Sequence, residues 1–225
     1  TSAGLGTRSS DATALSTGEI APFARVVASE TGLALRYRQP RVIELEARAA
    51  AFHTYVDQDL VFDAERGRNI VQGSSSRLGA LAWARVRLAG FLDVAGSLAW
   101  SEAFLLRGGG QWTDWVSEER MPFVPRFVGR LDAATTHVLD IAGERVGFTL
   151  AVGVGVLGPR PLPLGTEARA VVLVDAGAQV RWRLVGIGVE FQNLADQRYA
   201  SSVFRHPSRF DPDAPDSRLP AEHFA

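Results

Sequence analysis

A strict alternation of large apolar residues with small or polar residues runs from Arg145 to Leu157. One face of this segment carries Val146, Phe148, Leu150, Val152, Val154 and Val156. The other face carries Arg145, Gly147, Thr149, Ala151, Gly153 and Gly155. A period of two residues is that of a β-strand, because successive side chains of a strand point to opposite faces. The segment therefore predicts a strand with one apolar face.

The same pattern, with the same contrast between its two faces, recurs along the chain. It predicts eight strands, at Arg25 to Arg38, Val42 to Phe62, Gly79 to Leu88, Phe91 to Trp100, Pro122 to Val138, Arg145 to Leu157, Ala168 to Arg183 and Leu184 to Gln192. No segment has the 3.6-residue period of a long amphipathic helix. The predicted fold class is all-β.

The connections between these strands alternate in length. Short connections are predicted near Gln39-Pro40, Ala89-Gly90, Asp140 to Gly143 and Arg183-Leu184. Long connections are predicted at Asp63 to Gln72, Arg107 to Met121, Gly158 to Glu167 and both ends of the chain. Short turns at one side and long loops at the other are typical of an outer-membrane β-barrel, whereas a soluble sandwich has no reason to sort its loops. We expect an antiparallel transmembrane β-barrel segment, about eight strands of a larger barrel.

Strand length and aromatic placement favour the same interpretation. The apolar faces approach the 9–11 residues that a tilted strand needs to cross a bilayer. Aromatic residues lie near the ends of these faces, as in an aromatic girdle: Tyr37, Trp100, Phe104, Trp182 and Phe191. The phase slips near Ala50 to Phe52, which predicts a bulge or an exit from the membrane. The alternative is a soluble β-sandwich with ordinary core aromatics.

Composition and motifs exclude several other classes. The net charge of −1 gives no general attraction to nucleic acid, and the lack of Cys excludes disulfides and thiolate metal sites. The G-x-G-x-x-G match at Gly153 to Gly158 is followed by prolines, so no helix can begin there to bind a dinucleotide. Asp211, Asp213 and Asp216 lack the EF-hand pattern and are interpreted as a solvated loop. We expect no catalytic residues, no cofactor and no metal, because the four His show no ligand spacing either: His53, His137, His206 and His223.

The segment from Glu190, EFQNLADQRYA, resembles the penultimate-strand signature of TonB-dependent outer-membrane receptors. The residues that carry this likeness are Asn193, Leu194, Asp196, Arg198 and Tyr199. Four other segments resemble strands of that family, in the expected order: Ser29 to Tyr37, Ala50 to Phe62, Ser74 to Val86 and Met121 to Leu131. Each motif alone is degenerate, whereas five in order over most of the chain are fairly specific.

The resemblance implies the position of the chain within such a receptor. Barrels of this family have about 22 strands around a plug. Residues 1–225 are expected to be the C-terminal portion of the barrel, without the plug and without the final strand, since Ser201 to Pro220 is predicted to be a polar loop. The implied location is the bacterial outer membrane. The implied role is active uptake of a scarce nutrient, such as an iron–siderophore complex or cobalamin.

The implied partners are outer-membrane lipid, a small-molecule ligand such as a metal chelate, and the TonB complex through an N-terminal region outside this chain. Four residues in or near the loop Arg107 to Met121 are candidates for ligand binding, since aromatic and Arg side chains suit planar or anionic ligands: Trp112, Trp115, Arg120 and Arg126. The alternative for this loop is a flexible Gly hinge with packing Trp residues. The alternative function is a small ligand-binding or adhesive β-barrel without TonB coupling, and an enzyme ranks third.

Overall fold

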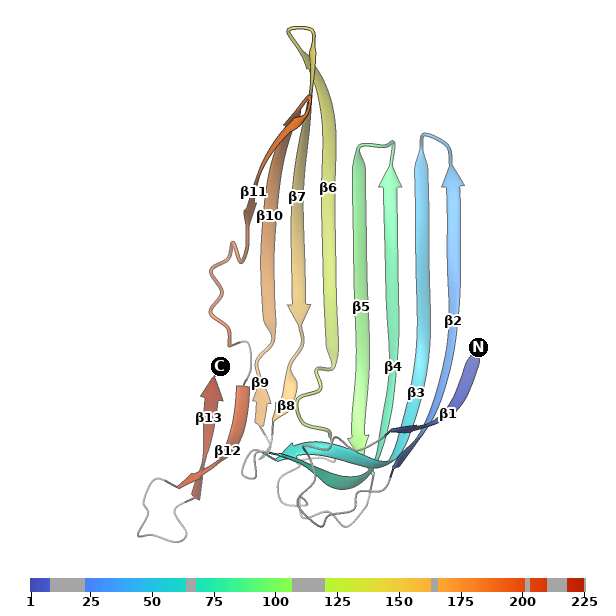
Figure 1. The fold of residues 1–225 in the computed structure, drawn as a ribbon, viewed down its shortest axis with the longest axis vertical. Helices are drawn as coiled ribbons and strands as arrows, with labels where there is room; N and C mark the ends of the chain where they lie inside the picture. Colours follow the sequence, from blue (N-terminus) through green and yellow to red (C-terminus); the bar gives the residue numbers. More distant parts are fainter. Residues whose placement is uncertain are drawn as a thin grey trace.

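One antiparallel sheet of nine strands dominates the molecule (Figure 1). The computed structural model describes residues 1–8, 23–63, 68–106, 120–162, 166–200, 203–209 and 218–224, with the backbone alone at 60–63, 68–72, 203–209 and 218–224. Neighbouring strands follow chain order, and β1 and β11 form the two open edges. The described chain is therefore all-β and mostly one open sheet.

The main sheet consists of β1 (Ser2–Arg8), β2 (Ala24–Gln39), β3 (Ile43–Asp63), β4 (Arg68–Leu88), β5 (Leu92–Leu105), β6 (Phe127–Ile141), β7 (Glu144–Leu157), β10 (Val171–Trp182) and β11 (Val185–Phe191). Two small sheets pair β8 (Arg160–Leu162) with β9 (Thr166–Ala168), and β12 (Val203–Arg209) with β13 (Arg218–Phe224). No helix in the described part of the chain is long and apolar enough to cross a membrane.

All eight predicted strands are present in the main sheet, but the count of eight is wrong because β1 adds a ninth. Its sequence, SAGLGTR, is rich in small residues and therefore alternates weakly. The strand predicted from Pro122 begins instead at Phe127, after Pro125, because proline has no amide N–H to donate to a ladder. The predicted loop from Ser201 to Pro220 contains β12 and the start of β13, which pair with each other as antiparallel strands.

The predicted short connections lie together at one end of the main sheet (Figure 1), but the long connection predicted at Asp63 to Gln72 is wrong, because β3 extends to Asp63 and β4 begins at Arg68. At one end, called the turn end, short turns join β2–β3, β4–β5, β6–β7 and β10–β11. The two-residue turn between β6 and β7 has positive φ at both Ala142 and Gly143, as a type I′ hairpin turn requires, and Ala89 and Gly90 in the three-residue β4–β5 turn also have positive φ. At the other end, called the loop end, lie the longer connections, one of which contains β8 and β9.

A bulge interrupts the β3–β4 pair near the loop end, not at Ala50 to Phe52 as predicted. Pairing is continuous from Ile43 to Val56, and the register shifts between Val56 and Asp59 and again before Leu60. An extra residue on one strand reverses the face on which later side chains lie. The bulge therefore brings Asp59 to the same face as Val56.

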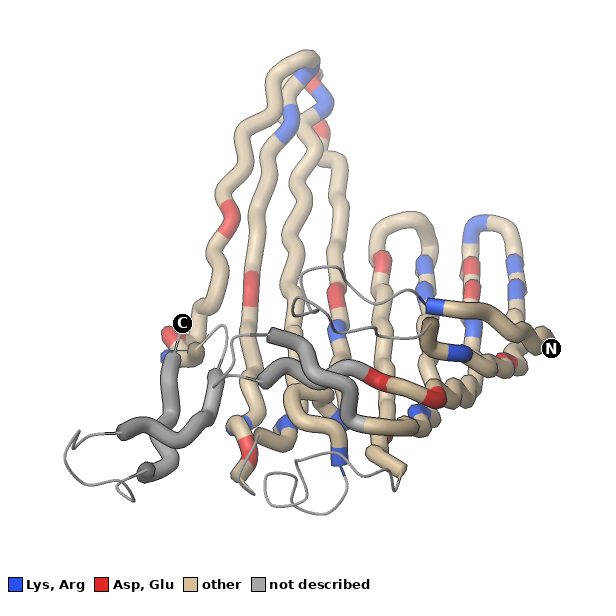
Figure 2. The backbone as a smooth tube through the Cα atoms, turned by 60° about the horizontal axis from the view of Figure 1, so that its bottom comes forward, with Lys and Arg blue, Asp and Glu red and all other residues tan. Residues whose placement is uncertain are grey.

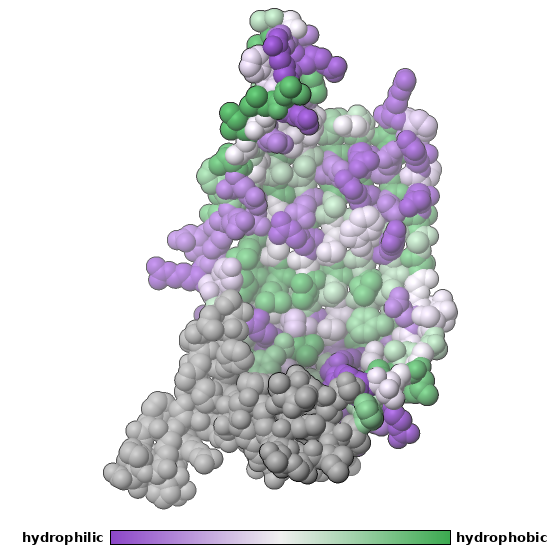
Figure 3. All heavy atoms as spheres, in the orientation of Figure 1, coloured by the Kyte–Doolittle hydropathy of each residue, from purple (hydrophilic) through white to green (hydrophobic). Residues whose placement is uncertain are grey.

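The two faces of the sheet differ in shape and chemistry. The small and polar side chains line a hollow, so this is the concave face, which Figure 3 shows with hydrophilic residues over β2–β5 and across the middle of β6–β10. The large apolar side chains cover the opposite, convex face and are exposed there, with Leu33 70% and Ile187 73% accessible. A separate buried cluster of Ala103 and Met121 lies at the loop end.

Candidate functional site

Strand register gathers charged residues into rows across the concave face. One row runs Arg38, Glu44, Arg87 and Asp93 over β2–β5, and each residue lies opposite the next. The adjacent row places Arg36, Glu46 and Arg85 opposite one another. Figure 2 shows these charged positions near the turns of the two hairpins. Opposite charges thus face each other on neighbouring strands, which stabilises the pairing.

These rows form two neighbouring sets of ion pairs, here together called the arginine lattice: Arg38, Glu44, Arg87, Asp93 and Arg85 in one, and Arg36, Glu46 and Arg48 in the other. Asp93 accepts hydrogen bonds from Arg85 at 2.8 and 2.5 Å and from Arg87 at 3.3 Å. Glu44 contacts Arg38 at 2.8 Å and Arg87 at 3.0 Å. The lattice therefore fills the β2–β5 side of the concave face with long, paired side chains in which arginine is in excess.

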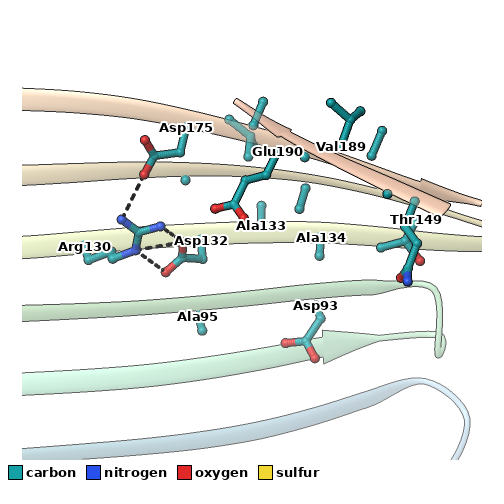
Figure 4. Close-up of a pocket in the computed structure, with 18 of the residues that line it drawn as sticks. Asp93, Ala95, Arg130, Asp132, Ala133, Ala134, Thr149, Asp175, Val189 and Glu190 are labelled. Atoms are coloured by element: carbon teal, nitrogen blue, oxygen red, sulfur yellow. Dashed lines mark hydrogen bonds and ion pairs between the residues drawn. The ribbon is translucent and has the colours of Figure 1, made fainter. Parts of the chain in front are cut away.

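The β6–β11 side of the concave face is hollow instead (Figure 4). A cavity of about 850 Å³ opens there, a volume that suits a small-molecule ligand. Its floor consists of small residues, among them Ala134, Ala151, Gly177 and Gly188. The hollow exists because alanine and glycine occupy positions where β2–β5 carry arginine and glutamate.

Arg130 lies between two carboxylates in this hollow (Figure 4). Its Nε donates to Asp132 at 3.0 Å, and its Nη1 donates to Asp175 on β10 at 3.2 Å. A Cβ at Gly153 would lie 2.6 Å from Arg130 Nη2 and 2.7 Å from Asp132 Oδ1. Glycine at this position on β7 is therefore what allows the Arg130 side chain to cross the strand.

A second ionic cluster, called the Asp59 cluster, lies at the loop end. The Asp59 side chain is 1% exposed and accepts hydrogen bonds from Ser75 at 2.5 Å, Arg77 at 2.5 Å and Arg8 at 3.0 Å. Arg77 also lies 3.7 Å from the sulfur of Met121. The cluster thus joins β1, the β3 bulge, β4 and the connection after β5.

Of the residues predicted to bind ligand, Arg120 and Arg126 do not line the hollow. Trp112 and Trp115 lie outside the described residues. Arg120 lies opposite Phe104 at the loop end, and Arg126 Nε lies 3.2 Å from Glu102. Their role in ligand binding stays a prediction.

The signature residues form a compact turn directly after β11. Asn193 and Asp196 have φ of 52° and 46°, a conformation that Asn and Asp adopt more readily than most residues. The Asn193 side chain makes two hydrogen bonds of 3.0 Å to the backbone of Gln197. Leu194 donates its N–H to the carbonyl of Val174 at 2.7 Å. The turn therefore has a defined structure, although its link to a receptor family stays a prediction.

Alternation placed Asp132, Asp175 and Glu190 on the polar faces of their strands, yet sequence reasoning did not identify them as one site. They lie on three different strands, β6, β10 and β11, and only the cross-strand register brings them around one hollow. Within the described ranges no three His, Asp or Glu residues are grouped so that they could hold a metal ion. The hollow offers hydrogen bonds, charge and space.

Comparison with protein-family models, with curated proteins and with solved structures finds no match to this chain.

Proposed function

We propose that this chain is part of the wall of an outer-membrane β-barrel receptor, with the convex face against lipid and the concave face toward an aqueous lumen. The observation that carries the proposal is the exposure of the convex apolar face along the whole sheet. Leu35, Leu98, Leu131 and Leu150 are each more than half exposed. Water contact of such side chains costs about 25 cal/mol for each Å², and lipid contact removes that cost.

The distribution of charge supports a lipid-facing surface. Across β2–β7 and β10, the convex side chains from the row of Leu33 to the row of Gln39 contain no charged residue in the described structure. Every residue of the arginine lattice lies on the opposite face. A lipid-facing charge near the bilayer midplane costs roughly 2–4 kcal/mol for Arg or Lys, so this strict separation fits a membrane wall.

Aromatic residues mark both ends of the uncharged band. Trp182 lies toward the turn end, where Arg183 lies 5.1 Å over its ring and bonds to Glu144. Trp100 lies toward the loop end, opposite Phe127. These rings are exposed on the convex face and suit the headgroup level of a bilayer. Of the predicted girdle, Tyr37 and Phe191 are also exposed, whereas Phe104 is half-buried.

Strand length agrees with the thickness of a bilayer. β10 has 12 residues and extends about 40 Å at about 3.3 Å for each residue. A tilt of about 45° reduces this to about 28 Å along the membrane normal, close to the hydrocarbon thickness of about 30 Å. The open edges β1 and β11 would then pair with further strands, since unpaired edge groups are costly in lipid.

Single cysteines test the orientation directly, because the chain has no cysteine of its own. Val152→Cys and Ala151→Cys are adjacent on β7 and face opposite sides, and both positions are exposed in the chain by itself. With the protein in its own membrane, a fluorophore at 152 should be quenched by nitroxide-labelled lipid, and one at 151 should not. The pair Val94→Cys and Ala95→Cys on β5 repeats the test. Equal quenching at both faces would contradict the proposal.

The role in nutrient uptake rests on the signature at Asn193 to Tyr199 and needs its own test. Uptake of a radiolabelled ferric siderophore and of labelled cobalamin would be compared in cells with and without the complete protein, before and after the proton gradient is collapsed. We expect one of these probes to need both the protein and the gradient. Uptake unaffected by the protein for both probes would contradict this part, even if the cysteine test succeeds.

A further inference from the structure

Asp175 on β10 bonds to two different parts of the molecule through its two carboxylate oxygens. Oδ2 accepts a hydrogen bond from Arg130 Nη1 at 3.2 Å, in the hollow. Oδ1 accepts one from the backbone N–H of Asn193 at 3.0 Å, at the start of the turn after β11. The Asp175 side chain is 22% exposed, and that of Arg130 is 49% exposed. A single carboxylate thus lies between a solvent-accessible arginine and a backbone turn.

The turn from Asn193 to Gln197 takes the place of a strand along half of β10. β11 pairs with β10 only from Ala176 to Trp182. Beyond that point, Val172 donates its N–H to the Gln197 side-chain oxygen at 2.9 Å, and the Val174 carbonyl accepts from Leu194. Exposed edge groups of this kind otherwise invite pairing with another chain. The turn therefore covers the edge of β10.

Arg130 is the group that holds the Asp175 carboxylate from the side of the hollow, opposite the Asn193 N–H. The guanidinium lies between Asp132 and Asp175 and pairs with both, so its single positive charge offsets part of the repulsion between them. Without this cation the two carboxylates would repel each other across the hollow, and Asp175 would be drawn toward water. The Asn193 N–H would then lose its acceptor, although Asn193 itself does not touch Arg130.

We propose that Arg130 and Asp175 form a charge-sensitive latch, in which the ion pair in the hollow holds the Asn193–Gln197 turn on the edge of β10. Arg130 is then a positioning residue for a turn that it does not contact. Any change that separates Arg130 from Asp175 would uncover the backbone groups of Val172 and Val174. The latch does not depend on whether the convex face meets lipid, so its failure and that of the proposed function are distinguishable.

The test is hydrogen–deuterium exchange of the complete protein, followed in the peptide that covers residues 190–199. Arg130→Gln should speed exchange there roughly ten-fold, as expected when a hydrogen bond to a charged group is lost. Arg85→Gln is the matched control, because Arg85 pairs with Asp93 on the same face without contact to the turn, and it should leave this peptide unchanged. Unchanged exchange in Arg130→Gln would overturn the proposal.

The salt dependence of exchange separates an electrostatic role of Arg130 from a role in packing alone. At about 1 M ionic strength the screening length is about 3 Å, against about 10 Å at 0.1 M, so the exposed ion pair weakens. High salt should speed exchange of the 190–199 peptide in the unmodified protein and in Arg85→Gln, but not further in Arg130→Gln. An equal salt response in all three would show that the turn is held without Arg130, and would reject the latch.

Discussion

The Asp59 cluster and the arginine lattice use the same residue types on the same face of the sheet, yet they differ in exposure. Asp59 is 1% exposed, whereas Asp93 is 30% exposed and Glu44 is 40% exposed. Buried ion pairs lose much when one partner is removed, because the other stays uncompensated, whereas exposed pairs contribute little. The contribution of each region to stability is therefore expected to follow the burial of its carboxylates and not the number of their contacts.

The largest loss of stability is expected for Asp59→Asn. The change leaves Arg8 and Arg77 near a neutral side chain in a buried position, and we expect a loss of about 3 kcal/mol, at the low end for breaking a buried pair because both arginines are partly exposed. The measurement is the urea midpoint of unfolding. A loss below that of Asp93→Asn would show that burial does not control the contribution of these ion pairs.

The next largest loss of stability is expected when a side chain is added at Gly153, beneath the Arg130–Asp132 ion pair. In Gly153→Ala the new Cβ meets Arg130 Nη2 and Asp132 Oδ1, and we expect a loss of about 1–2 kcal/mol from overpacking. Gly155→Ala is the control on the same strand and face, where the nearest atom would be Arg130 Nη1 at 3.7 Å. It should be neutral or slightly stabilising. Equal unfolding midpoints for the two variants would contradict the close approach at Gly153.

Removal of the central acid of the lattice should have a smaller effect. Asp93→Asn releases Arg85 and Arg87, but water screens all three groups, and we expect less than about 1 kcal/mol. The difference from the unmodified protein should shrink further at high salt, since exposed charges are screened within a few Å. Unfolding at low and high salt measures both quantities. A large loss of stability that salt does not change would mean that the lattice contributes as a buried ion pair does, like the Asp59 cluster.

The smallest effect is expected at the tip of the turn end, where Glu144 accepts hydrogen bonds from Arg183. This contact lowers the pKa of Glu144 below its ordinary value of 4.5, with help from the Trp182 side chain and against the effect of burial. A lowered pKa stabilises the fold above that ordinary value, and this contribution is lost as the pH falls through the lowered pKa.

The measurement is the difference in unfolding midpoint between the unmodified protein and Glu144→Gln, as a function of pH. The difference should be present at neutral pH and should vanish in acid. A difference that persists in acid would mean that the Glu144 charge does not cause it.

Much of the fold was predictable because a strand's two-residue period is a local property. Val146 to Val156 show which face of β7 is apolar, and Ala89-Gly90 shows where a hairpin turns. The position of the bulge was not predicted, because it depends on the register of Asp57 and Gln58 against β4. β1 was not predicted, because its small residues alternate weakly in hydrophobicity. The hollow was not predicted, because its charged residues lie on separate strands, β6, β10 and β11, and only the cross-strand register brings them together.

By itself, the sequence determined which face is apolar in the eight predicted strands and where the short turns lie, because both follow from patterns within a few residues. Only the tertiary structure decided that Arg130 lies between Asp132 and Asp175, that Asp59 is buried, and that the turn at Asn193 covers β10. These contacts join residues far apart in the chain. Register and curvature create them, and no local pattern of side chains specifies either.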